Sequence, residues 1–299
     1  MKILSIGHAA YDITFPVENF IVENTKNRVN NKIENGGGPA CTAAYLLGKW
    51  NADVTFLGIV GKDFYGEQII SELESVNVNT KYIEKKENYQ TTSSIIINNQ
   101  TNGSRTILTY RPNTIVMNDV KLDFTPDIIL IDGQEYELSK KMIERYPNAI
   151  SIIDASRTTK EIIELSKIVD YLVCSLNFAE ELSQIKTNKE DNSTYANLYG
   201  NLEKLFSNNI IVTLEEKGCL YKKDGVIKIM PSLNTNAVDT TGAGDIFHGA
   251  FTYGISKKYD IETILKISNI AGAVSTKYIG GRNSVRTLEE MSKYSEIFK

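Results

Sequence analysis

The stretch "NAVDTTGAGDIFHGAF" places small residues directly before an acid at the start of a helix-like run. Gly242 and Gly244 let the backbone come close to an anion, and the N–H groups of Gly242, Ala243 and Gly244 could stabilise negative charge developing there. Asp245, in the first helical turn, could take a proton from a substrate hydroxyl. A glycine-rich turn with a capping acid is the alternative, because such a motif alone has low specificity.

The hydrophobic pattern indicates which elements position this turn. Short apolar runs rich in β-branched residues predict buried strands at "KILSIG", Asp53–Gly61, Asp127–Gly133, Ala149–Asp154, Tyr171–Leu176 and Asn209–Leu214. Segments with apolar residues at helical spacing lie between several of them. This alternation predicts an α/β fold, a mostly parallel sheet with helices on both faces, formed by residues 1–299 as one domain. Ligands of such sheets bind beyond the carboxyl ends of the strands.

Two segments, about 13–35 and 90–111, interrupt the alternation. The second predicts a β-hairpin, because Asn102-Gly103 lies between two strand-like runs and this dipeptide is typical of tight hairpin turns. Strands that lie outside a βα core can form a small separate sheet. We therefore expect these segments to pack together as a β-sheet lid over the main sheet.

Composition excludes several classes of partner. The 299 residues carry a formal net charge of -4 and contain no basic block, so nucleic acid is not expected as a partner. No apolar run reaches membrane-spanning length, and the N-terminus lacks the pattern of a signal peptide. Cys41, Cys174 and Cys219 are far apart and odd in number, which argues against a disulfide framework or zinc site and favours the reducing cytoplasm.

Several motifs, in order along the chain, resemble those of the ribokinase-like (PfkB) carbohydrate kinases. They are "GHAAYD" ending at Asp12, "GGGPACTAA", "GIVGKDFYG", Asp154–Arg157, Asn177–Glu180 and "TTGAGDIF". The resemblance covers nearly the whole chain. It implies a ribokinase-like three-layer α/β/α core with a small β-sheet lid, and an enzyme that transfers the γ-phosphoryl group of ATP to a hydroxymethyl group of a sugar.

The resemblance also implies a role for each matching residue. Asp245 would be the general base, and the N–H groups of Gly242, Ala243 and Gly244 would stabilise the transferring phosphoryl group. The residues expected to hold the sugar are Asp12, Gly37, Gly38, Thr42, Arg157 and Asp245. Those expected at the nucleotide are Asn177, Thr213, Glu215, Gly218, Gly242, Gly244, Asn269 and Ala273. Mg²⁺ is expected near Asn177 and Glu180 through water, and a monovalent cation such as K⁺ near Asp239, Thr241, Gly280 and Ser284.

Two positions depart from the family pattern. Thr42 falls where the family usually has an asparagine that reaches the sugar, and Glu215 replaces the glycine of a "TLG" motif beside the phosphates. The "LEEKG" stretch and the hairpin sequence are similar to those of ketohexokinases. This similarity favours fructose or a similar ketose as acceptor, with ribose as a further candidate.

Other functions fit the same motifs. A nucleoside kinase of the adenosine type would also phosphorylate a ribose hydroxyl, and a non-catalytic sugar sensor would keep the fold. The intact "TTGAGD" motif argues against the sensor. Lid sheets of this family often pair between subunits, which shields exposed strand edges, so we expect a homodimer through the lid.

Overall fold

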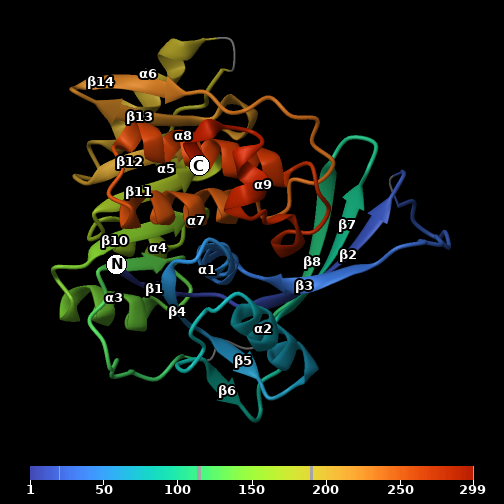
Figure 1. Ribbon diagram of the computed structural model, residues 1–299. Helices are drawn as coiled ribbons and strands as arrows, with labels where there is room; N and C mark the ends of the chain where they lie inside the picture. The colour runs from blue at the N-terminus through green and yellow to red at the C-terminus, as the bar shows by residue number, and fades with distance from the viewer. Residues whose placement is uncertain (20, 113–115, 189–190, 299) are drawn as a thin grey trace.

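The computed structural model describes all residues except 20, 113–115, 189–190 and 299. In this part of the chain, an eight-stranded central sheet has the order β14-β13-β12-β11-β10-β9-β1-β4 (Figure 1). The strands are β1 (Lys2–Ile6), β4 (Asp53–Leu57), β9 (Ile128–Ile131), β10 (Ile150–Ala155), β11 (Tyr171–Ser175), β12 (Asn209–Thr213), β13 (Cys219–Lys223) and β14 (Val226–Met230). All pairs from β4 to β12 are parallel, whereas β13 and β14 pair antiparallel. The predicted mostly parallel sheet is confirmed.

Helices cover both faces of this sheet, and each face has its own hydrophobic core. One face packs against α1 (Pro39–Lys49), α7 (Ala243–Ser256) and α8 (Ile261–Ser275). The other packs against α3 (Tyr136–Arg145), α4 (Lys160–Ser166), α5 (Leu176–Ser183) and α6 (Asn192–Leu202). Successive strand residues alternate between the two cores: Ile3 joins the first and Leu4 the second. Continuous apolar strands are what a parallel sheet buried on both faces requires.

A second sheet projects from the main body, to the right in Figure 1. Its order is β3 (Ile33–Gly37), β2 (Ala10–Val17), β7 (Ser93–Asn99) and β8 (Ser104–Tyr110). Strands β2 and β7 are parallel, and the other two pairs are antiparallel. The two segments predicted to leave the core therefore form one small sheet. Because β2 begins at Ala10 and β3 ends at Gly37, this sheet also includes Asp12 and Gly37, which the motifs assign to the sugar.

Three local features differ from the sequence predictions. The run Asp53–Gly61 divides into β4 and β5 (Ile59–Gly61), and β5 pairs with β6 (Glu84–Lys86) in a separate two-stranded sheet. The β7–β8 connection is a loop of residues 100–103 rather than a two-residue turn, and Gly103 has a φ of 69°. Strands β13 and β14 were not predicted.

The remaining helical elements are short or peripheral. They are α2 (Phe64–Ser75), α9 (Leu288–Ser292) and 3₁₀ turns at Glu215–Lys217, Arg282–Ser284 and Glu296–Phe298. No helix in the described part of the chain is both long and apolar enough to cross a membrane. The three cysteines, all of them described, are buried with free thiols.

Candidate active site

The glycine turn (residues 241–244) includes the first two residues of α7, which begins at Ala243. Gly242 has a φ of 75°, a conformation that favours glycine, and a Cβ added to it would lie 3.0 Å from the Cα of Gly281. Around Gly244, in contrast, a Cβ would meet no atom within 4 Å. The first N–H groups of a helix have no partner inside the helix. The N–H of Thr241 donates to Asp239 Oδ1 (2.9 Å) and that of Ala243 to the carbonyl oxygen of Thr240 (3.4 Å), so the N–H groups of Gly242 and Gly244 are the candidate anion donors of this turn.

Asp245 lies in the first turn of α7 and is partly buried. Burial raises its pKa to about 7, and the nearby carboxylates of Asp154, Asp12 and Asp132 add to the increase, whereas His248 opposes it. Asp132 follows β9, Asp154 is the penultimate residue of β10, and Asp12 lies in β2, the strand that comes after β1 in the chain; β10, β9 and β1 are neighbours in the sheet. Their side chains converge because parallel strands bring their carboxyl ends to one edge. A carboxyl that titrates near neutral pH is suited to general-base catalysis.

Asp12 lies in β2, opposite Asn35 of β3. Burial raises its pKa to about 6, although a hydrogen bond from Ser94 and the charge of Arg282 oppose the increase. A Cβ added to Gly37 would lie only 2.0 Å from Asp12 Oδ2, so only glycine allows the backbone to pass this close. Gly38, which caps α1, has a φ of 93°. The glycine run thus brings the start of α1 against the Asp12 carboxylate.

Asp132 is a site residue that the sequence motifs did not identify. Its buried carboxylate accepts hydrogen bonds from the backbone N–H groups of His8 (2.8 Å), Gln134 (3.0 Å) and Ala40 (3.2 Å). A Cβ on Gly7 would lie 2.1 Å from Asp132 Oδ1. Asp132 therefore ties the ends of β1 and β9 to the start of α1. The acid near the end of the predicted strand-like run Asp127–Gly133 was the available signal.

His248 connects α7 with β10 and β11. Its Nδ1 lies 2.7 Å from the carbonyl oxygen of Gly244 and 3.2 Å from Asp154 Oδ2, and its Nε2 lies 3.2 Å from the carbonyl oxygen of Val173. Both ring nitrogens therefore face oxygen atoms. This contact fixes the start of α7, and with it Asp245, over the carboxyl ends of the central strands.

The two remaining sugar candidates differ in accessibility. Thr42 lies in α1 and is only 1% exposed, which leaves little surface for a ligand. Arg157 follows β10 and is exposed. Burial and, to a smaller extent, the charges of Arg111 and Arg157 lower the pKa of His8 to about 3, so both guanidinium groups lie near His8.

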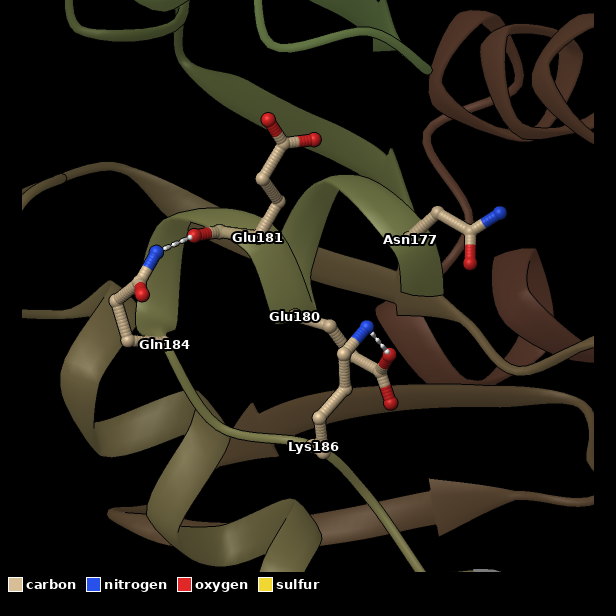
Figure 2. Close-up of a pocket in the computed structure, with 5 residues that line it drawn as sticks. All are labelled: Asn177, Glu180, Glu181, Gln184 and Lys186. Atoms are coloured by element: carbon tan, nitrogen blue, oxygen red, sulfur yellow. Dashed lines mark hydrogen bonds and ion pairs between the residues drawn. The ribbon is translucent and has the colours of Figure 1, made fainter.

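The predicted Mg²⁺ residues lie on α5, beside a hollow of about 510 Å³ lined by Asn177, Glu180, Glu181, Gln184 and Lys186 (Figure 2). Asn177 is exposed in the first turn. Glu180 Oε1 accepts hydrogen bonds from the N–H (2.8 Å) and hydroxyl (2.6 Å) of Thr187, and Oε2 lies 2.9 Å from Lys186 Nζ. Within the described residues, no group of three or more His, Cys, Asp or Glu side chains is arranged for a metal ion. Any Mg²⁺ here would depend on phosphate oxygens and water, as is usual for this ion.

The nucleotide candidates beyond α5 surround the ends of β12 and β14. Thr213 ends β12, and its hydroxyl donates to the Cys174 carbonyl oxygen (3.3 Å). Asn269 is 4% exposed, and its Nδ2 donates to the carbonyl oxygens of Met230 (2.9 Å) and Pro231 (3.3 Å). The Asn269 amide therefore holds the end of β14 against α8. Ala273 lies one turn further along α8 and is partly exposed.

Glu215 and Gly218 form the turn between β12 and β13. Both have positive φ angles, 55° for Glu215 and 103° for Gly218. A Cβ on Gly218 would lie 2.0 Å from the Met230 carbonyl oxygen, so this position requires glycine. Glu215 is exposed, and it occupies a backbone conformation in which glycine would be unstrained.

The predicted monovalent-cation residues come together behind the glycine turn. Asp239 Oδ1 accepts from the N–H (2.9 Å) and hydroxyl (2.7 Å) of Thr241, and Oδ2 accepts from the N–H of Gly280 (2.8 Å). Ser284 donates to the carbonyl oxygen of Gly281 (2.5 Å). Asp239 is 1% exposed, and no lysine, arginine or histidine among the described residues bonds to it. A buried carboxylate without a cationic partner fits a bound cation.

Comparison with known proteins identifies the family and the fold. Residues 1–288 match the family model of the pfkB family carbohydrate kinase. A ribokinase from Lactococcus lactis is 25% identical over 271 residues (87% of this chain, 86% of the relative), and a nucleoside kinase from Methanocaldococcus jannaschii is 24% identical over 285 residues (93% and 90%). The ribokinase of Arabidopsis thaliana, solved with ribose and ATP, aligns with a TM-score of 0.81 at 20% identity over 100% of this chain and 98% of that one. The fold is therefore ribokinase-like, and the chain is a phosphotransferase that belongs to the pfkB family of carbohydrate kinases.

Proposed function

We propose that this kinase transfers the γ-phosphoryl group of ATP to a hydroxymethyl group of a sugar. The sugar is either ribose or a ketose such as fructose. The observation that carries the proposal is the position of Asp245, which follows the glycine turn and lies near Asp12. A base, an anion-binding turn and a second carboxylate able to hold sugar hydroxyls therefore meet at one edge of the sheet. Phosphoryl transfer needs mainly this kind of positioning and charge stabilisation.

Each residue contributes a separate part of the reaction. Asp12 and the backbone at Gly37 and Gly38 orient the sugar. Asp245 takes the proton of the hydroxymethyl group as its oxygen forms a bond to the γ-phosphorus and the bond between that phosphorus and ADP breaks. The N–H groups of the glycine turn stabilise the charge on the transferring group. The small sheet acts as a lid that excludes water, which would otherwise accept the phosphoryl group.

The metal assignments rest on two different arrangements. Mg²⁺, when bound, neutralises phosphate charge, and Asn177 with Glu180 would contact its water shell. The hydrogen bonds of Glu180 to Thr187 and Lys186 fix its carboxylate at the hollow and favour such an indirect role. The Asp239 carboxylate is buried, and no cationic side chain in the described part of the chain bonds to it, which supports a K⁺ site beside Thr241, Gly280 and Ser284.

The acceptor is tested by comparing kcat/KM for fructose, ribose, adenosine and 2-keto-3-deoxygluconate with ATP and Mg²⁺. Activity confined to adenosine would assign the chain to the nucleoside kinases, an alternative that the nucleoside kinase relative supports. Sugar binding without phosphoryl transfer would indicate a sensor. Transfer to fructose or ribose at the highest kcat/KM is the result that the proposal predicts.

We also propose that the protein is a homodimer that pairs through the small sheet and acts in the cytoplasm. All seven residues of the edge strand β8 are exposed. Ile95, Ile107, Leu108 and Tyr110 are large apolar residues exposed on β7 and β8. An exposed apolar edge of this kind is normally covered by another chain or by a protective device.

A further inference from the structure

Arg282 is a charged side chain enclosed in the interior. It lies in the 3₁₀ turn Arg282–Ser284 and is 2% exposed. Its Nη1 donates to Glu72 Oε2 of α2 (2.9 Å), its Nη2 donates to Cys41 Sγ of α1 (2.9 Å), and its guanidinium carbon lies 5.2 Å from the centre of the Tyr45 ring. Burying a guanidinium group is costly even when it is paired, so a buried ion pair is by itself weak evidence for a stabilising role.

The side chain of Arg282 contacts the acceptor side of the site. Glu72 Oε2, its partner, also accepts a hydrogen bond from the N–H of Gly36 (2.9 Å). A Cβ on Gly36 would lie 2.1 Å from Arg282 Nη1, so the guanidinium group lies against the backbone of β3. The next residue, Gly37, touches Asp12. Arg282 and Glu72 therefore fix the strand that holds the Asp12 carboxylate in place.

The backbone that carries Arg282 contacts the phosphoryl side. Gly280 donates to Asp239, which also binds the N–H of Thr241 at the start of the glycine turn. The Cα of Gly281 lies 3.0 Å from the position of a Cβ on Gly242. One residue thus joins two half-sites: its side chain fixes β3 and its neighbours in the chain support the glycine turn.

We propose that Arg282 is a positioning residue that sets the distance between the acceptor bound at Asp12 and the phosphoryl group bound at the glycine turn. Rigid spacing of two reactants is a large part of catalysis by approximation, and a misplacement of about 1 Å can cost about 10²-fold in rate. The same link couples the binding of sugar and of nucleotide, because ordering one half-site orders the other. The effect of Arg282 on phosphoryl transfer rests on the proposed function, whereas the structural link between β3 and the glycine turn does not.

The test uses Arg282→Met, which keeps an unbranched apolar stem and leaves Glu72 partly solvated, since the Glu72 side chain is 28% exposed. Cys41→Ala is the milder variant, because it removes one acceptor and leaves the ion pair. Arg145→Met is the matched control: Arg145 binds Asp119 through two hydrogen bonds (2.7 and 2.8 Å) at the C-terminal end of α3. Hydrogen exchange, kinetics and nucleotide binding are measured on each full-length variant.

In Arg282→Met, amide exchange should accelerate in both 33–40 and 237–246, by about tenfold or more, because the link that protects them is gone. The kcat with the preferred acceptor should fall by about 10–10²-fold. Sugar should no longer tighten the binding of a non-hydrolysable ATP analogue, an effect typically of about 5–150-fold between coupled sites. Cys41→Ala should shift each quantity in the same direction by less, and Arg145→Met should shift none of them.

Faster exchange in only one of the two segments, or equal changes in Arg145→Met, would overturn the proposed link and leave an ordinary buried ion pair. If the wild type phosphorylates no acceptor, the proposed function fails, while exchange in the two segments still decides whether Arg282 joins them. Should Arg282→Met not fold, the exchange and coupling measurements on Cys41→Ala decide instead, with unchanged values contradicting the proposal.

Discussion

At the scale of single residues, Glu215 has a backbone conformation that is unfavourable for a residue other than glycine. Its φ of 55° is one that side chains other than glycine adopt at a cost of about 1–2 kcal/mol. Glu215→Gly should therefore raise the free energy of unfolding by about 0.5–1 kcal/mol, after the greater entropy of an unfolded glycine is deducted. It should also lower KM for ATP, because the resemblance places this residue beside the phosphates. Denaturant unfolding and ATP kinetics measure the two effects.

Glu216→Gly provides the control for this prediction. Glu216 lies in the same 3₁₀ turn, but its φ is not positive. Glycine there gains no relief from strain and adds unfolded-state entropy, so stability should fall by about 0.5–1 kcal/mol. If both variants lost stability equally, the proposed strain at Glu215 would be wrong.

The acids around Asp245 predict the pH dependence of the reaction. Burial and the Asp154 carboxylate raise the pKa of Asp245 to about 7, so kcat/KM should rise with pH through that region as the base loses its proton. Asp154→Asn removes a negative charge and lowers the pKa of Asp245, so the rise of kcat/KM should move to lower pH. Asp123→Asn, which removes an exposed carboxylate paired with Lys81, should leave the profile unchanged. If kcat/KM of Asp154→Asn rose at the same pH as that of the wild type, the proposed interaction between Asp154 and Asp245 would be wrong.

The same pKa shifts determine how stability depends on pH. In the folded protein the pKa values of Asp245 and Asp12 are raised, to about 7 and about 6. Their contribution to stability is therefore full below the ordinary pKa of a carboxyl group and is lost as pH rises through these values. The carboxylates needed for the reaction thus lower stability in the pH range where they are charged.

The sequence identified site residues whose roles depend on local motifs. Asp245 and the glycine turn lie together in the chain, and the helix start that they form follows from adjacent residues. Arg282 could not be found in this way, because its role arises from a contact with Gly36, far away in the sequence. For Asp132 the strand-like run placed an acid at the sheet edge, but its role depends on the distant backbone of Ala40. A lone buried arginine has no sequence signal that separates it from a surface arginine.

At the scale of elements, hydrophobic runs predicted the parallel strands, while turn dipeptides gave mixed results. The β13–β14 hairpin was missed although Asp224-Gly225, with φ values of 52° and 78°, has the conformation typical of a two-residue hairpin turn. Asn102-Gly103 predicted such a turn and formed a longer loop instead. There the side chains of Asn99 and Asn102 accept hydrogen bonds from the N–H groups of Thr101 and Ser104, which stabilise the wider loop.

The hairpin of the small sheet contacts the segment that leads to the glycine turn. Asn98 Nδ2 donates to the carbonyl oxygen of Val238 (3.1 Å), and Arg105 donates to the Thr240 hydroxyl. Gly103 lies against the same segment, since its Cβ would be 3.0 Å from the carbonyl oxygen of Ala237. The small sheet and the glycine turn are therefore connected directly, and movement of one changes the surroundings of the other.

At the scale of the whole molecule, the exposed face of the small sheet predicts a dimer. Sedimentation equilibrium at micromolar concentration should give a dimer for the wild type. Leu108→Lys should shift the equilibrium to the monomer, because a lysine on an edge strand opposes pairing. Val226→Lys, at an exposed apolar residue of β14, is the control and should remain dimeric. A wild-type monomer under these conditions would contradict the proposed dimer but not the assignment of the small sheet as a lid.

In the proposed reaction, Asp245 is the base of a phosphoryl transfer that the glycine turn supports. The most direct test compares kcat of the wild type and Asp245→Asn at saturating ATP and acceptor, with the dissociation constant of ATP measured in parallel. The variant keeps the shape of the side chain and loses its ability to accept a proton, so kcat should fall by about 10²–10⁴-fold while ATP affinity is retained. Near wild-type turnover in Asp245→Asn would show that Asp245 is not the general base.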